Sequence, residues 1–302
     1  MKETARTLLL LHTAVFLAGW TGVFGRLIAL SGLPLVWYRI WVSVATMALV
    51  LALAGRLHKV GRSALLQIGG CGILLALHWV AFYASIQASN VSIGVACIAT
   101  TCFFTAVFNP LIGGKRFSWP EVLISFISIA GVLLIFSLDV RYRIGILLGL
   151  LSAAIYSVFA ICNINVARRT GEDSATLLFY ELIGGALFLT LCMPAYARIF
   201  PDEAITPGGI DILWLLLLGS LFTIVPFLFQ LQALRKLNAF TVNLTYNLEP
   251  VYSMIIAAVL FDELHEVGWS FWLGLALIIL SVLLQTRRIQ SRRSDSGNFS
   301  IA

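Results

Sequence analysis

Long apolar segments, separated by short polar or Pro/Gly-containing breaks, follow one another along nearly the whole chain. Each segment has about 20 residues, the length that an α-helix needs to cross the hydrocarbon core of a bilayer. We therefore predict an all-α integral membrane protein with ten transmembrane helices. The predicted ranges are Thr7–Leu30, Pro34–Ala54, Ala64–Ala88, Val91–Gly113, Pro120–Leu138, Ile144–Ala167, Ala175–Ala197, Ile212–Leu234, Ala239–Phe261 and Gly268–Thr286. The narrowest break is Ser89–Asn90, between the third and fourth helices.

Basic residues gather in every second connection between the predicted helices. If the N-terminus is cytoplasmic, the opposite side carries only Arg141, Arg143 and Arg198. The cytoplasmic segments then hold Lys2, Arg6, Arg56, Lys59, Arg62, Lys115, Arg116, Arg168, Arg169, Arg235, Lys236, Arg287, Arg288, Arg292 and Arg293. Such a bias is typical of cytoplasmic loops. We therefore predict a multi-pass protein of the bacterial inner membrane with both termini in the cytoplasm.

The composition excludes a large soluble domain. The chain has 302 residues, of which 60% are hydrophobic and 11% charged, whereas a soluble domain has roughly 25% charged residues. The net charge of +6 is divided among short clusters beside the apolar segments, so it indicates membrane orientation rather than nucleic-acid binding. The five cysteines lie within apolar segments without metal-ligand spacing. We interpret them as packing residues and predict neither a metal nor a cofactor.

The two halves of the chain match weakly, in the same helix order. Tyr38 in the second predicted helix corresponds to Tyr180 in the seventh, and Gln87–Ala88 in the third corresponds to Gln232–Ala233 in the eighth. Because five is an odd number, the second half enters the membrane inverted relative to the first. Inverted repeats are typical of secondary transporters. The predicted units are residues 7–138 and 144–286, followed by a polar cytoplasmic tail at 287–302.

A family resemblance rests mainly on the ninth predicted helix. The chain reads Glu249–Pro250–Val251 there, and Asp262–Glu263–Leu264 follows the next apolar run. These segments resemble the Glu-Pro-Val segment and the acidic turn of the EamA family, in the drug/metabolite transporter superfamily. Trp20, Arg39 and the segment Ala130–Leu134 also match, and the resemblance extends from about Thr7 to Arg288. It implies two inverted five-helix repeats with a substrate cavity between them.

The first repeat departs from the family pattern at two places. Phe104–Thr105 stands where the second repeat has Glu249–Pro250, and Gly114–Lys115–Arg116 replaces the acidic turn. The first repeat therefore lacks two acidic positions, which argues against a symmetric scheme of ion coupling.

Ionisable residues within predicted helices are costly and often functional, and three of them are the main candidates for chemistry. Glu249 precedes a proline that frees a backbone carbonyl, so it either binds substrate or a proton, or braces a bend in the helix. Arg39 either reaches the interface or holds a substrate carboxylate through a bidentate contact. His78 is either a group that titrates near neutral pH or a hydrogen-bonded structural residue.

Aromatic and polar side chains also share helix faces. Trp79 and Tyr83 are four residues apart, and Asn243, Tyr246, Asn247 and Pro250 recur at positions i, i+3, i+4 and i+7. Such faces either point into a cavity for a small amphipathic solute or pack helices together. The candidate substrate-binding residues are Trp20, Arg39, His78, Trp79, Tyr83, Thr101, Tyr156, Tyr246, Asn247 and Glu249.

These patterns together predict a gradient-driven transporter and not an enzyme. The expected activity is export of small neutral or zwitterionic metabolites, such as amino acids, by alternating access. A transporter of nucleobases, other metabolites or drugs is the alternative within the same fold, and a lipid-modifying membrane enzyme is the alternative of another class. No phosphate-binding G-x-x-x-x-G-K-[ST] loop is present. The expected partners are the substrate, the bilayer and a candidate coupling proton, in a monomer or homodimer.

Overall fold

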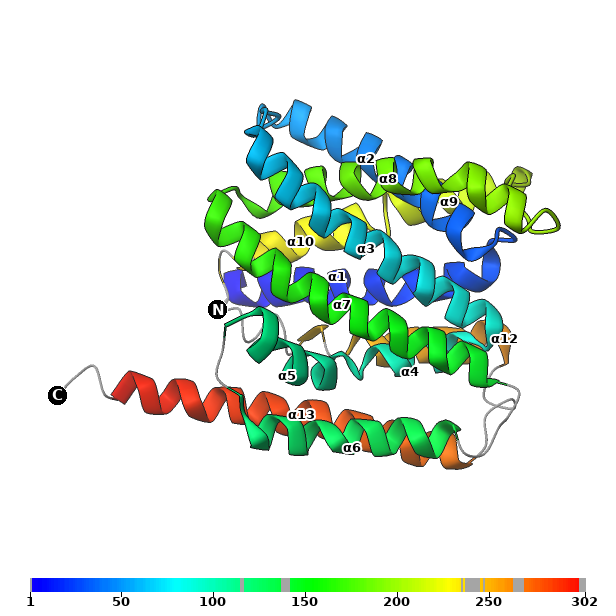
Figure 1. The fold of residues 1–302 in the computed structure, drawn as a ribbon. Coiled ribbons are helices and arrows are strands. Elements are labelled where there is room, and N and C mark those ends of the chain that lie inside the picture. Colours follow the sequence, from blue (N-terminus) through cyan, green and yellow to red (C-terminus); the bar gives the residue numbers. More distant parts are fainter. Residues whose placement is uncertain are drawn as a thin grey trace.

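The computed structural model describes residues 2–114, 117–136, 142–234, 236, 245–246, 248–262 and 269–298, and its elements there are all helices (Figure 1). The first half comprises α1 Lys2–Leu27, α2 Gly32–Leu53, α3 Arg62–Ala88, α4 Val91–Ile98, α5 Thr101–Ile112 and α6 Trp119–Phe136. The second half comprises α7 Arg143–Thr170, α8 Ser174–Ile199, α9 Gly209–Gly219, α10 Ile224–Leu234, α12 Glu249–Phe261 and α13 Trp269–Asn298.

The described helices confirm a multi-pass membrane protein. Seven segments are long and apolar enough to cross a bilayer, with α4–α5 and α9–α10 each counting as one. Three shorter apolar helices lie at Val122–Gly131, Glu249–Phe261 and Trp272–Ser281, within the predicted fifth, ninth and tenth ranges.

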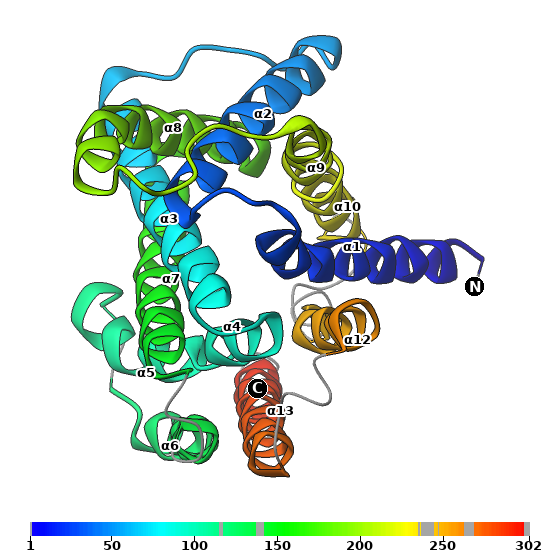
Figure 2. The same ribbon diagram turned by 90° about the vertical axis from the view of Figure 1, so that its right-hand side faces the viewer.

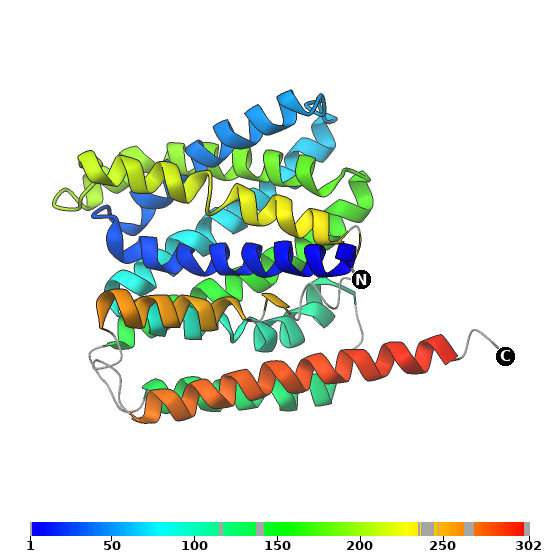
Figure 3. The ribbon, with the colours of Figure 1, turned by 180° about the vertical axis from the view of Figure 1, so that it is seen from behind.

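Two predicted helices are interrupted, and the prediction of continuous helices was wrong there. Ala99 and Thr100 separate α4 from α5, where the Thr100 hydroxyl donates to the Cys97 carbonyl at 2.6 Å. Residues 220–223 separate α9 from α10, which Figure 3 shows from behind. There the Thr223 hydroxyl donates to the Leu218 carbonyl at 2.6 Å, and Pro226 has no backbone N–H to offer a helix. Such side-chain bonds compete with the helical ladder.

The last helix is longer than predicted. We placed its end at Thr286, where the apolar run stops, but α13 continues to Asn298 and takes in most of the expected polar tail. The segment from 287 to 298 contains four arginines, which favour helix in a polar setting as well. Hydrophobicity therefore located the membrane segment but not the end of the helix.

The main contacts between the two halves have an internal symmetry. Helix α3 packs on α7 and α8, while α9 and α10 pack on α1 and α2; α4 and α5 pack on α7, while α12 packs on α1. Exchanging the halves converts each of these contacts into its counterpart, and α2–α8 and α6–α13 pair with themselves. Figure 2, which looks along the helices, shows the resulting ring of helices. This arrangement fits a fold of two repeats.

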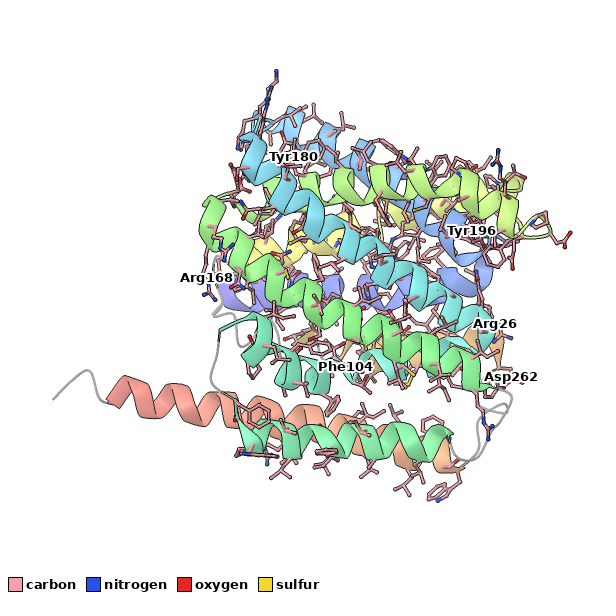
Figure 4. All side chains as sticks on the ribbon, viewed as in Figure 1. Arg26, Phe104, Arg168, Tyr180, Tyr196 and Asp262 are labelled. Atoms are coloured by element: carbon pink, nitrogen blue, oxygen red, sulfur yellow. The ribbon has the colours of Figure 1, made fainter. Side chains whose placement is uncertain are left out.

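The start of α1 and the end of α13 lie at the same end of the bundle, here called the terminal end (Figure 1). Arg168 and Tyr180 lie at this end, whereas Arg26, Tyr196 and Asp262 lie at the other, here called the far end (Figure 4). Arg168 belongs to the basic set that was expected on the side of the termini. Arg168 therefore lies at the same end of the bundle as the start of α1 and the end of α13.

Polar contacts join the repeats at the terminal end. The Arg56 guanidinium pairs with the Asp173 carboxylate at 3.0 Å, and His58 Nε2 lies 3.0 Å from Glu172 Oε2. The Tyr180 hydroxyl donates to the His58 carbonyl at 2.7 Å. This set, the terminal clasp, ties the α2–α3 connection of the first repeat to the α7–α8 connection of the second.

The far end has the equivalent connection. Ser31 donates from its hydroxyl to Glu203 and from its backbone to the Ala204 carbonyl at 3.2 Å. The Ala29 backbone N–H donates to Asp211 Oδ1 at 3.1 Å. This far clasp joins the α1–α2 and α8–α9 connections, which are the counterparts of the terminal-clasp loops when the repeats are exchanged. Both ends of the bundle are therefore held by bonds between the two repeats.

The terminal clasp is expected to respond to pH through His58. The hydrogen bond to Glu172, followed by that to the Arg56 carbonyl, raises the pKa of His58 above its ordinary value, which is about 6.5. A pKa that is higher in the folded protein means that the contact stabilises below about pH 6.5 and loses this effect as pH rises through the raised value. Histidine NMR titration should therefore show a midpoint above 6.5. Glu172→Gln should lower that midpoint, and Glu203→Gln, in the far clasp, should leave it unchanged; equal midpoints in all three proteins would contradict the contact.

Candidate functional site

A buried arginine is the centre of the candidate site. Arg39 lies in α2 with only 3% of its surface exposed. Its Nη1 donates to the Tyr83 hydroxyl at 2.8 Å, and its Nε donates to the Thr223 hydroxyl at 3.2 Å. The guanidinium carbon lies 4.0 Å from the centre of a Trp79 ring. Arg39 therefore does not extend to the interface, which was one of the two predicted roles.

Three helices and one helix break position these groups. Trp79 and Tyr83 lie one turn apart on α3 and so present one face to Arg39. Thr223 lies in the break between α9 and α10 and belongs to neither helix. Tyr83 also donates to the Thr21 carbonyl of α1 at 3.2 Å. Gly25 permits this approach, because a Cβ there would lie 2.6 Å from the Tyr83 ring.

Glu249 supplies the opposite charge. It is partly exposed, and its charge influences Arg39 although no ion pair or hydrogen bond joins these two described side chains. The hydroxyls of Tyr156 and Tyr246 also interact with its charge. Helix α12 begins at Glu249, so Pro250 occupies the first turn, which tolerates proline. The expectation of a glutamate in mid-helix was therefore wrong, because Glu249 is the first residue of α12.

His78 lies next to this group on α3. Its Nδ1 is 3.0 Å from the Ser152 carbonyl and 2.8 Å from the Ser152 hydroxyl, which also donates to the His78 carbonyl. The imidazole centre lies 4.7 Å from the Tyr156 ring centre. Ser152 thus fixes the ring against α7. These bonds support the structural role among the two that the sequence left open, although the ring still borders Tyr156.

The structure brings most of the predicted site residues together. Trp20 is more peripheral and packs on Phe222, with ring centres 5.9 Å apart. Thr101 donates to the Ile98 carbonyl at 2.6 Å, within its own chain segment. Asn247 lies outside the described residues. The connected set is Arg39, His78, Trp79, Tyr83, Tyr156, Tyr246 and Glu249.

Sequence analysis missed two residues of this site. Thr223 and Ser152 stand in apolar runs and do not belong to a polar helix face. For Thr223, the nearby Pro226 was the signal, because a proline in an apolar run weakens the helix ladder four residues before it. In the described residues, no group of His, Cys, Asp and Glu is arranged to hold a metal ion. The site therefore offers a cation, a carboxylate, hydroxyls and aromatic faces.

Comparisons with known proteins identify the fold and the family. A solved structure described only as "Crystal structure of protein" superimposes with a TM-score of 0.58 at 18% identity, over 93% of this chain and 98% of that one. At 18% identity, this structural similarity shows that the two proteins share a fold and does not show a shared function. No protein of curated function matches the chain. The profile of the EamA-like transporter family matches twice, at residues 5–137 and 143–287, so each half carries one copy. The chain belongs to the EamA-like transporter family.

Proposed function

We propose that this membrane transporter exports small zwitterionic or neutral metabolites, such as amino acids, across the bacterial inner membrane by alternating access. The observation that carries this proposal is the pair of opposite charges, Arg39 and Glu249, inside a bundle of apolar helices. Charged groups at membrane depth are costly and mark substrate or ion pathways.

Arg39 is suited to a carboxylate. Its Nε and Nη1 are held by Thr223 and Tyr83, and in the described part of the chain no acceptor is bonded to its Nη2. A guanidinium held in this way has little conformational freedom left to lose on binding, and it can present a planar edge to a carboxylate. Stacking on Trp79 orients that edge further.

Glu249 is suited to the other end of the same solute. A substrate ammonium group placed beside Glu249, with its carboxylate at Arg39, would satisfy both charges at once. A solute without net charge would enter the membrane at a lower electrostatic cost than an ion. Trp79 and Tyr156 offer apolar surface for a side chain between the two ends. We therefore favour zwitterions over phosphorylated or strongly ionic solutes.

The aromatic groups also favour a second candidate, a neutral nucleobase or other planar metabolite. Trp20 and Trp79 are partly exposed, and indole faces stack on planar rings with an offset or edge-on geometry. Such a solute would use hydroxyl and amide hydrogen bonds and would depend less on Arg39.

Alternating access has support from the internal symmetry. The two repeats make corresponding contacts when they are exchanged, and each end of the bundle has its own clasp between repeats. In inverted-repeat transporters, exchanging the conformations of the two halves opens the site to the opposite side. The direction of net transport would then follow the gradients.

Counterflow tests the proposal. Proteoliposomes would be preloaded with unlabelled amino acids and nucleobases, and labelled members would be offered one at a time beside empty liposomes. We expect one labelled amino acid to accumulate transiently above the empty control. Accumulation of nucleobases alone would favour the second candidate, and no accumulation of any label by folded protein would contradict both.

A further inference from the structure

A second buried carboxyl group lies outside the Arg39–Glu249 site. Glu181 lies in α8 with 2% of its surface exposed. The Asn163 side-chain amide of α7 donates to its Oε1 at 2.6 Å. In the part of the chain that the structure describes, no lysine or arginine lies within ion-pair distance of it.

The surroundings of Glu181 are closely packed and apolar. A Cβ at Gly72 of α3 would lie 1.9 Å from the Glu181 backbone carbonyl oxygen, so the two helix backbones touch at this point. An apolar cluster from α3, α7 and α8 covers the same region. Its buried members are Ile68, Cys71, Leu75, Phe159, Val166 and Leu177, with Tyr180 packed at the edge. Because α3 belongs to the first repeat and α7 and α8 to the second, Glu181 lies between the repeats.

The titratable groups near Glu181 carry little charge. Cys71 on α3 interacts with the Glu181 charge, Cys162 on α7 interacts with Cys71, and Tyr180 precedes Glu181 on its own helix. On α2, which also packs on α8, Arg39 is directed to Tyr83 and Thr223. None of these groups offsets an ionised carboxylate at this position.

The partner of Glu181 suits both of its charge states. An asparagine amide has donor hydrogens for an ionised carboxylate, and its oxygen can accept a hydrogen bond from a protonated one. A buried carboxylate without a cation is costly, so packing of α3, α7 and α8 around Glu181 favours the protonated form. Opening of this junction to water would favour release of the proton.

We propose that Glu181 is a proton-binding site, distinct from the substrate site, through which protonation controls the packing of α3 against α7 and α8. The proton enters from water at one end of the bundle and is released to water at the other, so no other reactant is required. The inference rests on the proposed transport function for its role, but the proton site itself stands on the geometry. The repeat places Glu181 where the first repeat has Arg39, since each follows a matched tyrosine. One repeat thus holds a fixed positive charge and the other a group that can lose its charge.

The first test needs no substrate. Infrared titration of the purified protein in phosphatidylcholine vesicles should show a protonated-carboxyl band that is absent from Glu181→Gln and present in Glu203→Gln. Asn163→Leu, which keeps Glu181 but removes its partner, should shift the same band, and it serves if Glu181→Gln does not fold. Spectra that are unchanged by both variants would overturn the proton site.

The second test separates coupling from transport. With the amino acid that shows counterflow, Glu181→Gln should exchange label within about twofold of the wild-type rate, a margin expected for a change that leaves the substrate site intact. It should lose accumulation driven by a pH gradient. The coupling role would be overturned if Glu181→Gln kept pH-driven accumulation at the wild-type level. It would also be overturned if the folded variant lost counterflow as well. If no solute shows counterflow, the proposed function fails while the infrared test still decides the proton site.

Discussion

Counterflow by Arg39→Ala is expected to fall to the level of empty liposomes. In the proposed binding mode, the substrate carboxylate is the partner of the Arg39 guanidinium. Removing one partner from such a buried, hydrogen-bonded charge pair costs about 2–5 kcal/mol, and about 1.4 kcal/mol is a factor of ten. The loss should therefore exceed about thirtyfold. The change removes the guanidinium that is proposed to bind the substrate carboxylate, while Tyr83 keeps its bond to the Thr21 carbonyl. We thus expect the variant to fold and to lose substrate binding.

Two further variants make this expectation specific. Arg39→Lys keeps the positive charge but loses the planar fork held by Thr223 and Tyr83, so it should recover only a small part of the rate. Arg198→Ala removes an exposed arginine from the last turn of α8 and should leave counterflow unchanged. Folding of each protein would be checked by size-exclusion chromatography. Wild-type counterflow by folded Arg39→Ala would remove Arg39 from the substrate site.

The sequence predicted helix positions well wherever a local signal marks a helix end. The Ser89–Asn90 break is an example, because the Asn90 side chain accepts from the Ile93 backbone N–H at 2.9 Å and so begins α4. Asparagine favours this N-cap position through a bond that spans only three residues. Hydrophobicity alone marks such breaks poorly, since the flanking segments are equally apolar.

The break between α9 and α10 shows the opposite case. The run Ile212–Leu234 is mostly apolar, so its hydrophobic periodicity does not show the interruption, and Pro226 is the only signal for it that we identified in the sequence. The break depends on the Thr223 hydroxyl and on Pro226, and it is used by Arg39, which lies 184 residues away in sequence. Local spacing cannot reveal a partner at that distance.

The same distinction applies to the candidate site. The i, i+4 spacing of Trp79 and Tyr83 correctly placed both on one helix face, and both contact Arg39. Spacing does not say which helix lies opposite a face, and so it could not pair Arg39 with Glu249. That pairing depends on how the two repeats pack.

Replacing Gly72 with alanine is expected to destabilise the whole bundle. The added methyl group would lie 1.9 Å from the Glu181 carbonyl oxygen, and this neighbour is backbone that cannot rotate away. Helix α3 would have to move from α8 and disturb the contact between the repeats. Overpacking of this kind costs about 1–3 kcal/mol and occasionally more. Thermal unfolding of the purified protein in detergent should show a clearly lower midpoint than the wild type.

Gly70 provides a matched control two residues away on the same helix. Apart from the backbone of its own helix and its two chain neighbours, no atom lies within 4 Å of a Cβ built at Gly70. Because alanine is a better helix former than glycine, by about 0.5–1 kcal/mol, Gly70→Ala should unfold at the wild-type midpoint or above it. The two glycine-to-alanine changes therefore have opposite expected signs, and only the α3–α8 contact distinguishes them. If Gly72→Ala matched Gly70→Ala, the two backbones would be further apart than described, and the close packing around Glu181 would no longer favour its protonated form.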